Sequence, residues 1–183
     1  MNSLGDRDMM RVLAAIAFVV FVPLVARGQE ADVAARNKEV IRRNYAHICA
    51  GDVKAAAADF AEEASNFGRS VGRSGIELTL EDILTTFPDY CLKIVEMVAV
   101  GDAVIVRCNV TGTHLGMGKR PANGGGLVGV TPTGKRHEIT HIHWYTLRDG
   151  KIVQHYANRD DLGMMRQLGL APPAPTVSAS PAR

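Results

Sequence analysis

Apolar residues follow two different patterns along this chain, and the change from one to the other falls at Pro88. Before it they recur at helical spacing, and after it they alternate with polar residues. The first predicted helix begins at Asp32, a good capping residue, and ends at Ala50-Gly51. Its apolar face consists of Val40, Ile41, Tyr45, Ile48 and Cys49.

Two further helices are predicted before the change of pattern. Asp52 can cap an alanine-rich helix that runs to about Glu63. The segment "GIELTLEDILTTF" also has helical spacing, and it stops before Pro88 because the residue before a proline disfavours helical backbone angles. These three predicted helices precede the strands, and a short closing helix over residues 162–168, capped by Asp160 or Asp161, is predicted after them.

After Pro88 the pattern predicts two antiparallel hairpins. The first joins "CLKIVEMVAV" to "AVIVRCNVTGTH" at the turn dipeptide Gly101-Asp102. The second joins "HEITHIHWYTL" to "KIVQHYANR". Helices followed by antiparallel strands predict an α+β fold, a curved sheet with helices on one face. In the first hairpin one face would hold Val104, Val106, Cys108 and Val110, and His114 has the same parity.

Both ends of the chain are predicted to lie outside the folded domain, residues 29–170. An apolar run over residues 12–25 is followed by the small-x-small sequence Ala26-Arg27-Gly28. The run is short for a membrane span. We therefore expect residues 1–28 to be a secretory signal and the mature protein to be exported, periplasmic or extracellular, without stable membrane insertion. Residues 171–183, rich in Pro, Ala and Ser, predict a disordered tail.

Composition argues against some function classes. The 183 residues include 21 Lys and Arg against 19 Asp and Glu, and without the signal the chain is almost neutral. No basic stripe is present that would bind nucleic acid. "GGGLVG" matches a dinucleotide-binding pattern literally, but the strand–helix context of that motif is missing. We expect a loop there, and no cofactor.

The three cysteines are predicted to be small buried thiols. If the first hairpin turns tightly at Gly101-Asp102, Cys91 faces Gly112 and Cys108 faces Val95. The sulfurs of Cys91 and Cys108 would then lie roughly 13 Å apart, too far for a disulfide.

The second hairpin brings histidines together. A three-residue loop, Arg148-Asp149-Gly150, is the expected bulged turn, and it pairs His143 with His155. A two-residue loop would instead pair His143 with Tyr156 and divide the cluster between two faces. We favour the first register because it keeps the partly polar residues together. Its shared face would hold His141, His143, Tyr145, His155 and Ala157.

Three histidines in this arrangement are compatible with two kinds of site. One is a zinc site built from strands, with an open fourth position. No Asp or Glu is evident on the same face to orient such ligands. We therefore favour the other, a small-molecule pocket in which the histidines form hydrogen bonds with a ligand or water.

Several segments resemble the SnoaL-like polyketide cyclase family, often labelled ester cyclases, of the nuclear transport factor 2-like superfamily. The resemblance implies a cone-shaped fold, in which a strongly curved antiparallel sheet packs against N-terminal helices around an apolar pocket. It also implies a homodimer formed through the outer face of the sheet. The matching segments, from about residue 37 to 169, are "NKEVIRRNYAHICAGDVKAAAADFAEEA", "VTGTH", "PTGKR", "DGKIVQHYANRDDLG" and "RQLG".

The resemblance implies a chemistry as well. Family cyclases close a ring by a cofactor-free intramolecular aldol reaction, in which a carboxylate removes a proton next to a carbonyl and a histidine assists. His143 matches the assisting histidine. The carboxylate position falls on Ala157, which cannot accept a proton. Another group would have to serve as the base.

Candidate catalysts and ligand contacts follow from this departure. His143 and His155 are the preferred acid/base pair, because neutral imidazole accepts protons near neutral pH. Asp161 matches an acidic position that relatives have before "LG", and its alternative role is a helix cap. Asn158 could donate a hydrogen bond to a developing enolate. The predicted ligand contacts are His141, Asn158, Tyr45, Asn66, His114 and Tyr145, with a place in the core as the alternative for Tyr45.

The sequence thus predicts a protein that binds a small apolar molecule in a pocket lined by histidines. If it is an enzyme, we expect cofactor-free proton abstraction of the cyclase or isomerase type. A non-catalytic binding or scaffold module is the first alternative, favoured by Ala157, and a zinc hydrolase with three histidine ligands is the second. The Gly-rich insertion over residues 116–134 could act as a lid or an entrance.

Overall fold

The structure is a computed structural model that describes residues 29–120 and 127–172. The predicted signal over residues 1–28 lies outside the described residues, as do most of the predicted tail and part of the Gly-rich insertion. In the described part, no helix is long and apolar enough to cross a membrane.

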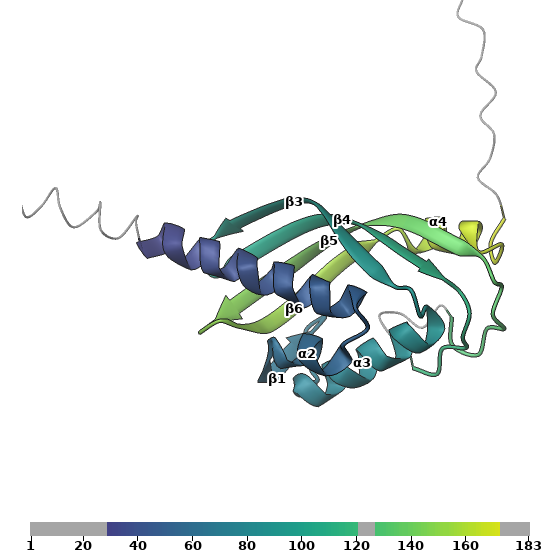
Figure 1. Ribbon diagram of the computed structural model, residues 1–183, viewed down its shortest axis with the longest axis horizontal. Coiled ribbons are helices and arrows are strands. Elements are labelled where there is room, and N and C mark those ends of the chain that lie inside the picture. The colour runs from purple at the N-terminus through teal and green to yellow at the C-terminus, as the bar shows by residue number, and fades with distance from the viewer. Residues whose placement is uncertain (1–28, 121–126, 173–183) are drawn as a thin grey trace, which may run out of the picture.

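Helices and strands combine as an α+β fold, as predicted (Figure 1). A long helix runs through residues 29–49, so Asp32 lies inside it rather than at its cap. The remaining helices are α2 (Val53–Ala58), α3 (Gly72–Thr86) and α4 (Asp161–Gln167). The strands are β1 (Phe60–Asn66), β2 (Arg69–Ser70), β3 (Cys91–Val100), β4 (Ala103–Thr113), β5 (Arg136–Arg148) and β6 (Lys151–Arg159).

The second predicted helix is shorter than expected. Asp52 caps it by accepting a hydrogen bond from the Ala55 amide, as predicted, but α2 ends at Ala58 instead of near Glu63. The residues that follow form β1, which pairs in parallel with β6. This segment is a strand because it pairs with β6, which is distant in sequence. The local alanine-rich composition favours a helix and carries no information about that pairing.

The six strands form one curved sheet in the order β2-β1-β6-β5-β4-β3 (Figure 1). The first hairpin has the predicted pairing next to its turn, from Val100 opposite Ala103 to Glu96 opposite Arg107. A bulge then shifts the register by one residue, so that Cys91 faces Thr111 instead of Gly112. The inward parity predicted for β4 and for His114 is confirmed, since these side chains are fully buried.

The loop predicted for the second hairpin is wrong, and so is the pairing of His143 with His155. The inward face that the three histidines were predicted to share is nevertheless right. Arg148 pairs with Lys151, so the turn has two residues, Asp149 and Gly150, and both have positive φ angles. A bulge at Val153, between the Leu147 and Thr146 pairs, then adds one residue on β6. This extra residue restores the inward parity that a two-residue turn alone would have reversed. The register beyond it places Tyr145 opposite His155, His143 opposite Ala157 and His141 opposite Arg159.

The main core lies between the inner face of the sheet and the helix over residues 29–49, which crosses that face in Figure 1. The predicted apolar face of the helix is buried there, apart from Cys49. Burial of this stripe against alternating strand residues is what holds helix and sheet together. A second, smaller cluster joins Phe87, Leu127 and Leu168 at the far end of the sheet.

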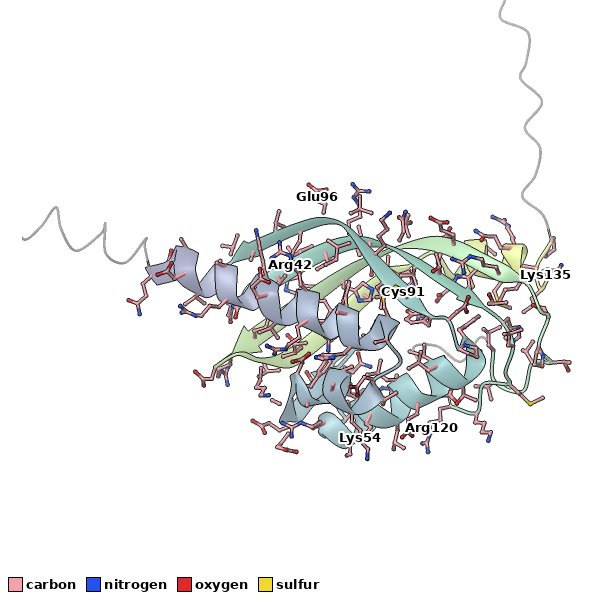
Figure 2. The ribbon with its side chains drawn as sticks, viewed as in Figure 1. Arg42, Lys54, Cys91, Glu96, Arg120 and Lys135 are labelled. Carbon is pink, nitrogen blue, oxygen red and sulfur yellow. A yellow bond between two sulfur atoms is a disulfide. The ribbon has the colours of Figure 1, made fainter. Side chains whose placement is uncertain are left out.

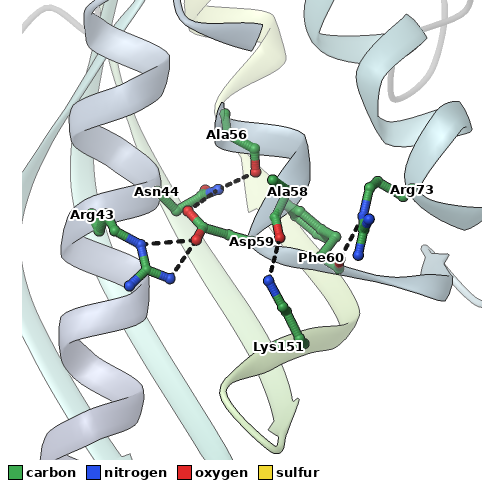
Figure 3. Close-up of polar contacts among 8 residues, drawn as sticks. All are labelled: Arg43, Asn44, Ala56, Ala58, Asp59, Phe60, Arg73 and Lys151. Atoms are coloured by element: carbon green, nitrogen blue, oxygen red, sulfur yellow. Dashed lines mark hydrogen bonds and ion pairs between the residues drawn. The ribbon is translucent and has the colours of Figure 1, made fainter. Parts of the chain in front are cut away.

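A buried carboxylate ties the helices to the sheet at the other end (Figure 3). Asp59 accepts hydrogen bonds from Arg43 and Asn44 of the long helix, and its backbone carbonyl accepts one from the Ile152 amide of β6. Lys151 donates to the Ala58 carbonyl at 2.7 Å in the same region. These contacts fix the start of β1 beside β6.

The cysteine prediction is wrong for two of the three residues. Cys49 and Cys91 form a disulfide that joins the end of the long helix to the start of β3, and Figure 2 shows Cys91 close to that helix end. The prediction compared only Cys91 with Cys108, which indeed do not pair. Cys108 is a free, buried thiol, as expected. The packing of helix on sheet brings Cys49 and Cys91 together.

Candidate functional site

Three histidine rings form a continuous hydrogen-bonded chain on the inner face of β5 and β6. His155 Nδ1 lies 2.9 Å from Asn66 Oδ1, and His155 Nε2 lies 2.8 Å from His143 Nδ1. His143 Nε2 lies in turn 3.2 Å from His141 Nδ1. Each of the three histidines is buried, with His155 the most exposed at 9%. The face predicted to hold them together is therefore confirmed.

Two tyrosines connect this chain to the core. The Tyr145 hydroxyl donates a hydrogen bond to the Tyr45 hydroxyl at 3.2 Å and lies 3.3 Å from His143 Nδ1. The Tyr45 hydroxyl is 4.0 Å from Cys108 Sγ. Burial raises the pKa of both phenols, so that both remain protonated at neutral pH. Tyr45 occupies the core position that was its alternative role.

A cavity of about 310 Å³ opens beside β5, between α3, α4 and residues 118–120 and 127–128. Its wall is mainly apolar, with Phe87, Ile139 and Met164 among the lining residues. Of the histidine chain, His141 lies on this wall, and the predicted acid/base pair His143 and His155 lies behind it. The charged and histidine side chains of the wall are Asp82, Arg120, His137, His141, Arg159 and Asp161.

Two histidines of the cavity wall have buried ring nitrogens without partners among the described residues. His141 Nε2 is buried and has no hydrogen-bond partner among the described residues. His137 is 1% exposed, and neither of its ring nitrogens has a partner in the described part of the chain. Its ring packs edge-on against Phe87, with centroids 4.9 Å apart. Buried polar atoms without partners are rare, and at a cavity wall they favour a bound ligand or water.

A cation lies next to His141 at the wall. Arg159 is the cross-strand neighbour of His141, and its side chain is 17% exposed. It forms an ion pair with Asp161, with Arg159 Nη2 2.7 Å from Asp161 Oδ2. Asp160 caps α4 by accepting from the Gly163 amide, so the cap interpretation of Asp161 is wrong. Asp161 instead lines the cavity.

Burial makes the histidines of this region neutral at pH 7. It lowers the pKa of His141 to about 3, with smaller contributions from the charges of His143 and Arg159. Burial likewise lowers the pKa of His155 to about 3 and that of His137 to about 4. The pKa of His143 also falls well below its usual value, mainly through burial. Each ring therefore carries one proton, and its two nitrogens play different roles.

Two predicted ligand contacts lie elsewhere. Asn158 is exposed on the outer face, opposite Ile142, so the strand's alternation turns it away from the histidines. His114 is buried inside, but its Nδ1 receives the Thr133 amide at 3.3 Å and thus holds the loop after β4. Asn66 does reach the cluster, through His155, while its side chain is not on the cavity wall.

Four charged or histidine residues of the wall were missed by sequence reasoning: Asp82, Arg120, His137 and Arg159. His137 has the same parity on β5 as His141, a signal that could have identified it. Arg159 is the last residue of β6 and has the same parity as His155. Asp82 carried no signal, since it lies on α3 and accepts the Lys119 and Arg120 amides from a loop distant in sequence.

The histidine geometry differs from that of a metal centre. The four inner ring nitrogens of the chain face one another in two pairs instead of facing a common point. Within residues 29–120 and 127–172, no group of three or more His, Cys, Asp or Glu side chains is placed to hold a metal ion. This geometry gives no support to the zinc alternative.

The model of the SnoaL-like polyketide cyclase family matches residues 38–168. The chain belongs to this family. Solved structures with the same fold include the following. TsrD from Streptomyces laurentii superposes with a TM-score of 0.65 at 23% identity, over 75% of this chain and 97% of TsrD. AclR from Streptomyces galilaeus, described as a candidate hydroxylase, superposes with a TM-score of 0.64 at 24% identity, over 78% of this chain and 87% of AclR.

A third structure is IdmH from Streptomyces antibioticus, described as a candidate polyketide cyclase. It superposes with a TM-score of 0.60 at 27% identity, over 73% of this chain and 98% of IdmH. A search of curated proteins found no match. Family and fold are therefore established by the match over residues 38–168, and the reaction has to be argued from the site.

Proposed function

We propose that this SnoaL-like protein catalyses a cofactor-free acid/base reaction on a small, largely apolar carbonyl compound, an intramolecular aldol ring closure or an isomerisation. The observation that carries the proposal is the unpartnered Nε2 of His141 at the cavity wall. In this proposal the His141 ring turns this buried nitrogen toward a ligand in the cavity, where a neutral imidazole nitrogen can accept a proton. The base thus moves from the predicted pair, His143 and His155, to His141.

The proposed step transfers a proton from the carbon next to a carbonyl to His141 Nε2. The carbon–hydrogen electron pair moves into the enolate, whose negative charge forms beside the new imidazolium, so the net charge of the cavity does not change. Burial lowers the pKa of His141 to about 3, so the neutral ring is a weak base and its imidazolium a strong acid. The first transfer therefore depends on stabilisation of the enolate by a neighbouring cation, and the return of the proton in the second half of the reaction is easy. That proton ends on the aldol oxygen or on the isomerised carbon.

Arg159 supports the negative charge. It lies across from His141 on the neighbouring strand and lines the same cavity. A fixed cation near a developing enolate oxygen stabilises it strongly in a buried site. Asp161 holds the guanidinium in place through their ion pair, which makes Asp161 a positioning residue in this proposal instead of the base.

The cavity also limits the ligand. Its volume is near the lower end for small-molecule sites, which begin at about 300 Å³, and its wall is mainly apolar. The ring nitrogens of His137, which lack partners in the described chain, would contact a second oxygen of the ligand. A compact molecule with two oxygens on an apolar skeleton fits these walls.

His141→Gln is the direct test, because glutamine keeps a polar group of similar size that cannot act as a base. We expect turnover of linear poly-β-ketone methyl esters, followed by mass spectrometry, to fall by about 10²–10⁴-fold. Thr140→Ala, which changes the exposed neighbour on β5, is the matched control and should keep its activity. Unchanged turnover in His141→Gln would exclude His141 as the base.

A non-catalytic binding module is the second candidate. Ala157 favours it, because the family's carboxylate position holds no proton acceptor. Native mass spectrometry of freshly purified protein separates the candidates. A retained compound that incubation with the protein leaves unchanged, together with no turnover of the esters, favours the binding module.

Export and dimerisation complete the proposal. The disulfide Cys49–Cys91 supports export, because disulfides persist mainly in oxidising compartments. Ile142, Trp144 and Tyr156 are exposed on the outer face of the sheet and support a homodimer through that face. Secretion of a chain that begins near Gln29 and a dimer mass in light scattering are the expected results. A cytoplasmic full-length chain or a monomer at micromolar concentration would contradict them.

A further inference from the structure

Asn66 stands at the outer end of the histidine chain and could determine the direction of all its hydrogen bonds. Its Oδ1 faces His155 Nδ1 at 2.9 Å, and an amide oxygen only accepts hydrogen bonds. His155 Nδ1 therefore carries the hydrogen, and His155 Nε2 presents its lone pair to His143. His143 must then donate through Nδ1, so that its Nε2 accepts from His141 Nδ1.

A second contact is compatible with the same direction. While the Tyr145 hydroxyl donates to Tyr45, it accepts from His143 Nδ1, 3.3 Å away. A hydroxyl hydrogen rotates to suit its partners, so this contact follows the tautomer of His143 and does not fix it. Asn66, whose Oδ1 only accepts, is the residue that assigns the tautomer.

We propose that Asn66 sets the tautomers of His155, His143 and His141 as one unit and so makes the unpartnered Nε2 of His141 a proton acceptor. Asn66 is then a positioning residue that acts on the cavity through three rings. The effect of Asn66 on turnover rests on the proposed function of His141. The assignment of the tautomers does not depend on that function.

The chain also provides a balanced route for charge. When His141 Nε2 accepts a proton, its Nδ1 proton can pass to His143 Nε2, and the His143 Nδ1 proton to His155 Nε2. The positive charge then rests on His155, whose Nδ1–H still bonds to Asn66. The reverse sequence returns each proton, and the three rings end as they began. No further reactant is required.

Removing the acceptor at position 66 should reverse the chain. A neutral histidine without a partner at Nδ1 favours the tautomer protonated at Nε2. His155 would then donate to His143 Nδ1, His143 Nε2 to His141 Nδ1, and His141 would present an N–H to the cavity. A base would become a hydrogen-bond donor without any change in the cavity wall.

Nitrogen-15 NMR of histidine-labelled full-chain protein at pH 7 tests this directly. In the native protein we expect the chemical shift of His141 Nε2 in the range of an unprotonated ring nitrogen and that of Nδ1 in the range of a protonated one. In Asn66→Leu the assignment should be reversed, with Nε2 protonated and Nδ1 unprotonated. Asn66→Asp, whose carboxylate still accepts, should keep the native pattern. Ser65→Ala, the neighbouring change on β1, is the matched control and should not alter it. If Asn66→Leu does not fold, Asn66→Ala carries the same test.

The NMR pattern and the turnover of the variants test the two proposals separately. A protonated His141 Nε2 in the native protein, or an unchanged pattern in both Asn66→Leu and Asn66→Ala, would overturn the proposal. If the tautomers behave as expected while His141→Gln keeps full turnover, the role of Asn66 stands and the proposed function fails. If the tautomers exchange and turnover falls together in Asn66→Leu, but not in Asn66→Asp, both stand.

Discussion

His143 lies directly opposite Ala157 across β5 and β6. The position that the family resemblance implies for an assisting histidine and the one that it implies for a carboxylate are thus cross-strand neighbours, whose Cβ atoms lie about 5 Å apart in such pairs. By that resemblance this chain keeps the histidine and has a methyl group at the carboxylate position. His141 and His155 contact the ring of His143 on either side.

Ala157→Asp should restore a carboxylate next to His143. The negative charge would raise the pKa of His143, opposing the effect of burial, and would add a second base to the site. We expect turnover of the poly-β-ketone methyl esters to rise by about 10-fold or more. Ala157→Asn is the matched control, with the same shape and no charge. Equal turnover in the two variants would show that the alanine does not limit catalysis.

His137→Leu should stabilise the protein and weaken ligand binding. A buried polar group without a hydrogen bond costs about 1–3 kcal/mol, and this ring has two such nitrogens. After the loss of its contact with Phe87 we expect a net gain of about 1 kcal/mol in the free energy of unfolding, measured in urea at pH 7.

His114→Leu is the control for this prediction. His114 is equally buried, but its Nδ1 accepts the Thr133 amide, so the same change should destabilise the protein. A loss of stability in His137→Leu as large as that in His114→Leu would contradict the view that the ring nitrogens of His137 lack hydrogen-bond partners in the ligand-free protein.

Acid should destabilise this protein earlier than it does most proteins. The pKa values of His137, His141 and His155 in the folded chain are about 4, 3 and 3, below the value of about 6.5 in the unfolded chain. Between these values the unfolded chain binds more protons, so the free energy of unfolding falls as the pH falls below about 6.5. Each histidine contributes about 1.4 kcal/mol per pH unit.

Urea unfolding between pH 7.5 and 5 measures this dependence. His137→Leu should reduce the slope below pH 6 by the contribution of one histidine, about 1.4 kcal/mol per pH unit. Wild-type stability that is constant from pH 7.5 to 5 would mean that these histidines bind protons alike in the native and unfolded chains, and that burial does not lower their pKa values.

The Cys49–Cys91 disulfide should contribute about 4 kcal/mol of stability, because it closes a loop with a sequence separation of 42. The double variant Cys49→Ala/Cys91→Ala should lose this amount in urea and should no longer respond to a reductant. Cys108→Ala removes the buried free thiol and is the control, in which the response to reductant remains. Three reactive thiols in the unfolded, non-reduced wild type would contradict the assignment.

Much of the fold followed from local pattern. The alternation in β4 and β5 identified the inward side chains because residues of equal parity share a face of a strand. For this reason the histidine cluster was predicted correctly from an incorrect turn. A two-residue turn together with a bulge at Val153 preserves the parity that a three-residue loop would have produced. Face depends on parity, whereas the exact partners depend on turn and bulge together.

The sequence by itself determined the α+β order, the inward face of each hairpin arm and the absence of a proton acceptor at position 157. Only the tertiary structure decided that Ala58 ends α2, that Cys49 meets Cys91, and that His141 instead of His143 faces the cavity. The physical reason is the range of the interactions. Side-chain parity and helix caps act within a few residues, but a cavity and its protonation states arise where β5, α3 and α4 pack together, with each contributing groups that no local pattern relates.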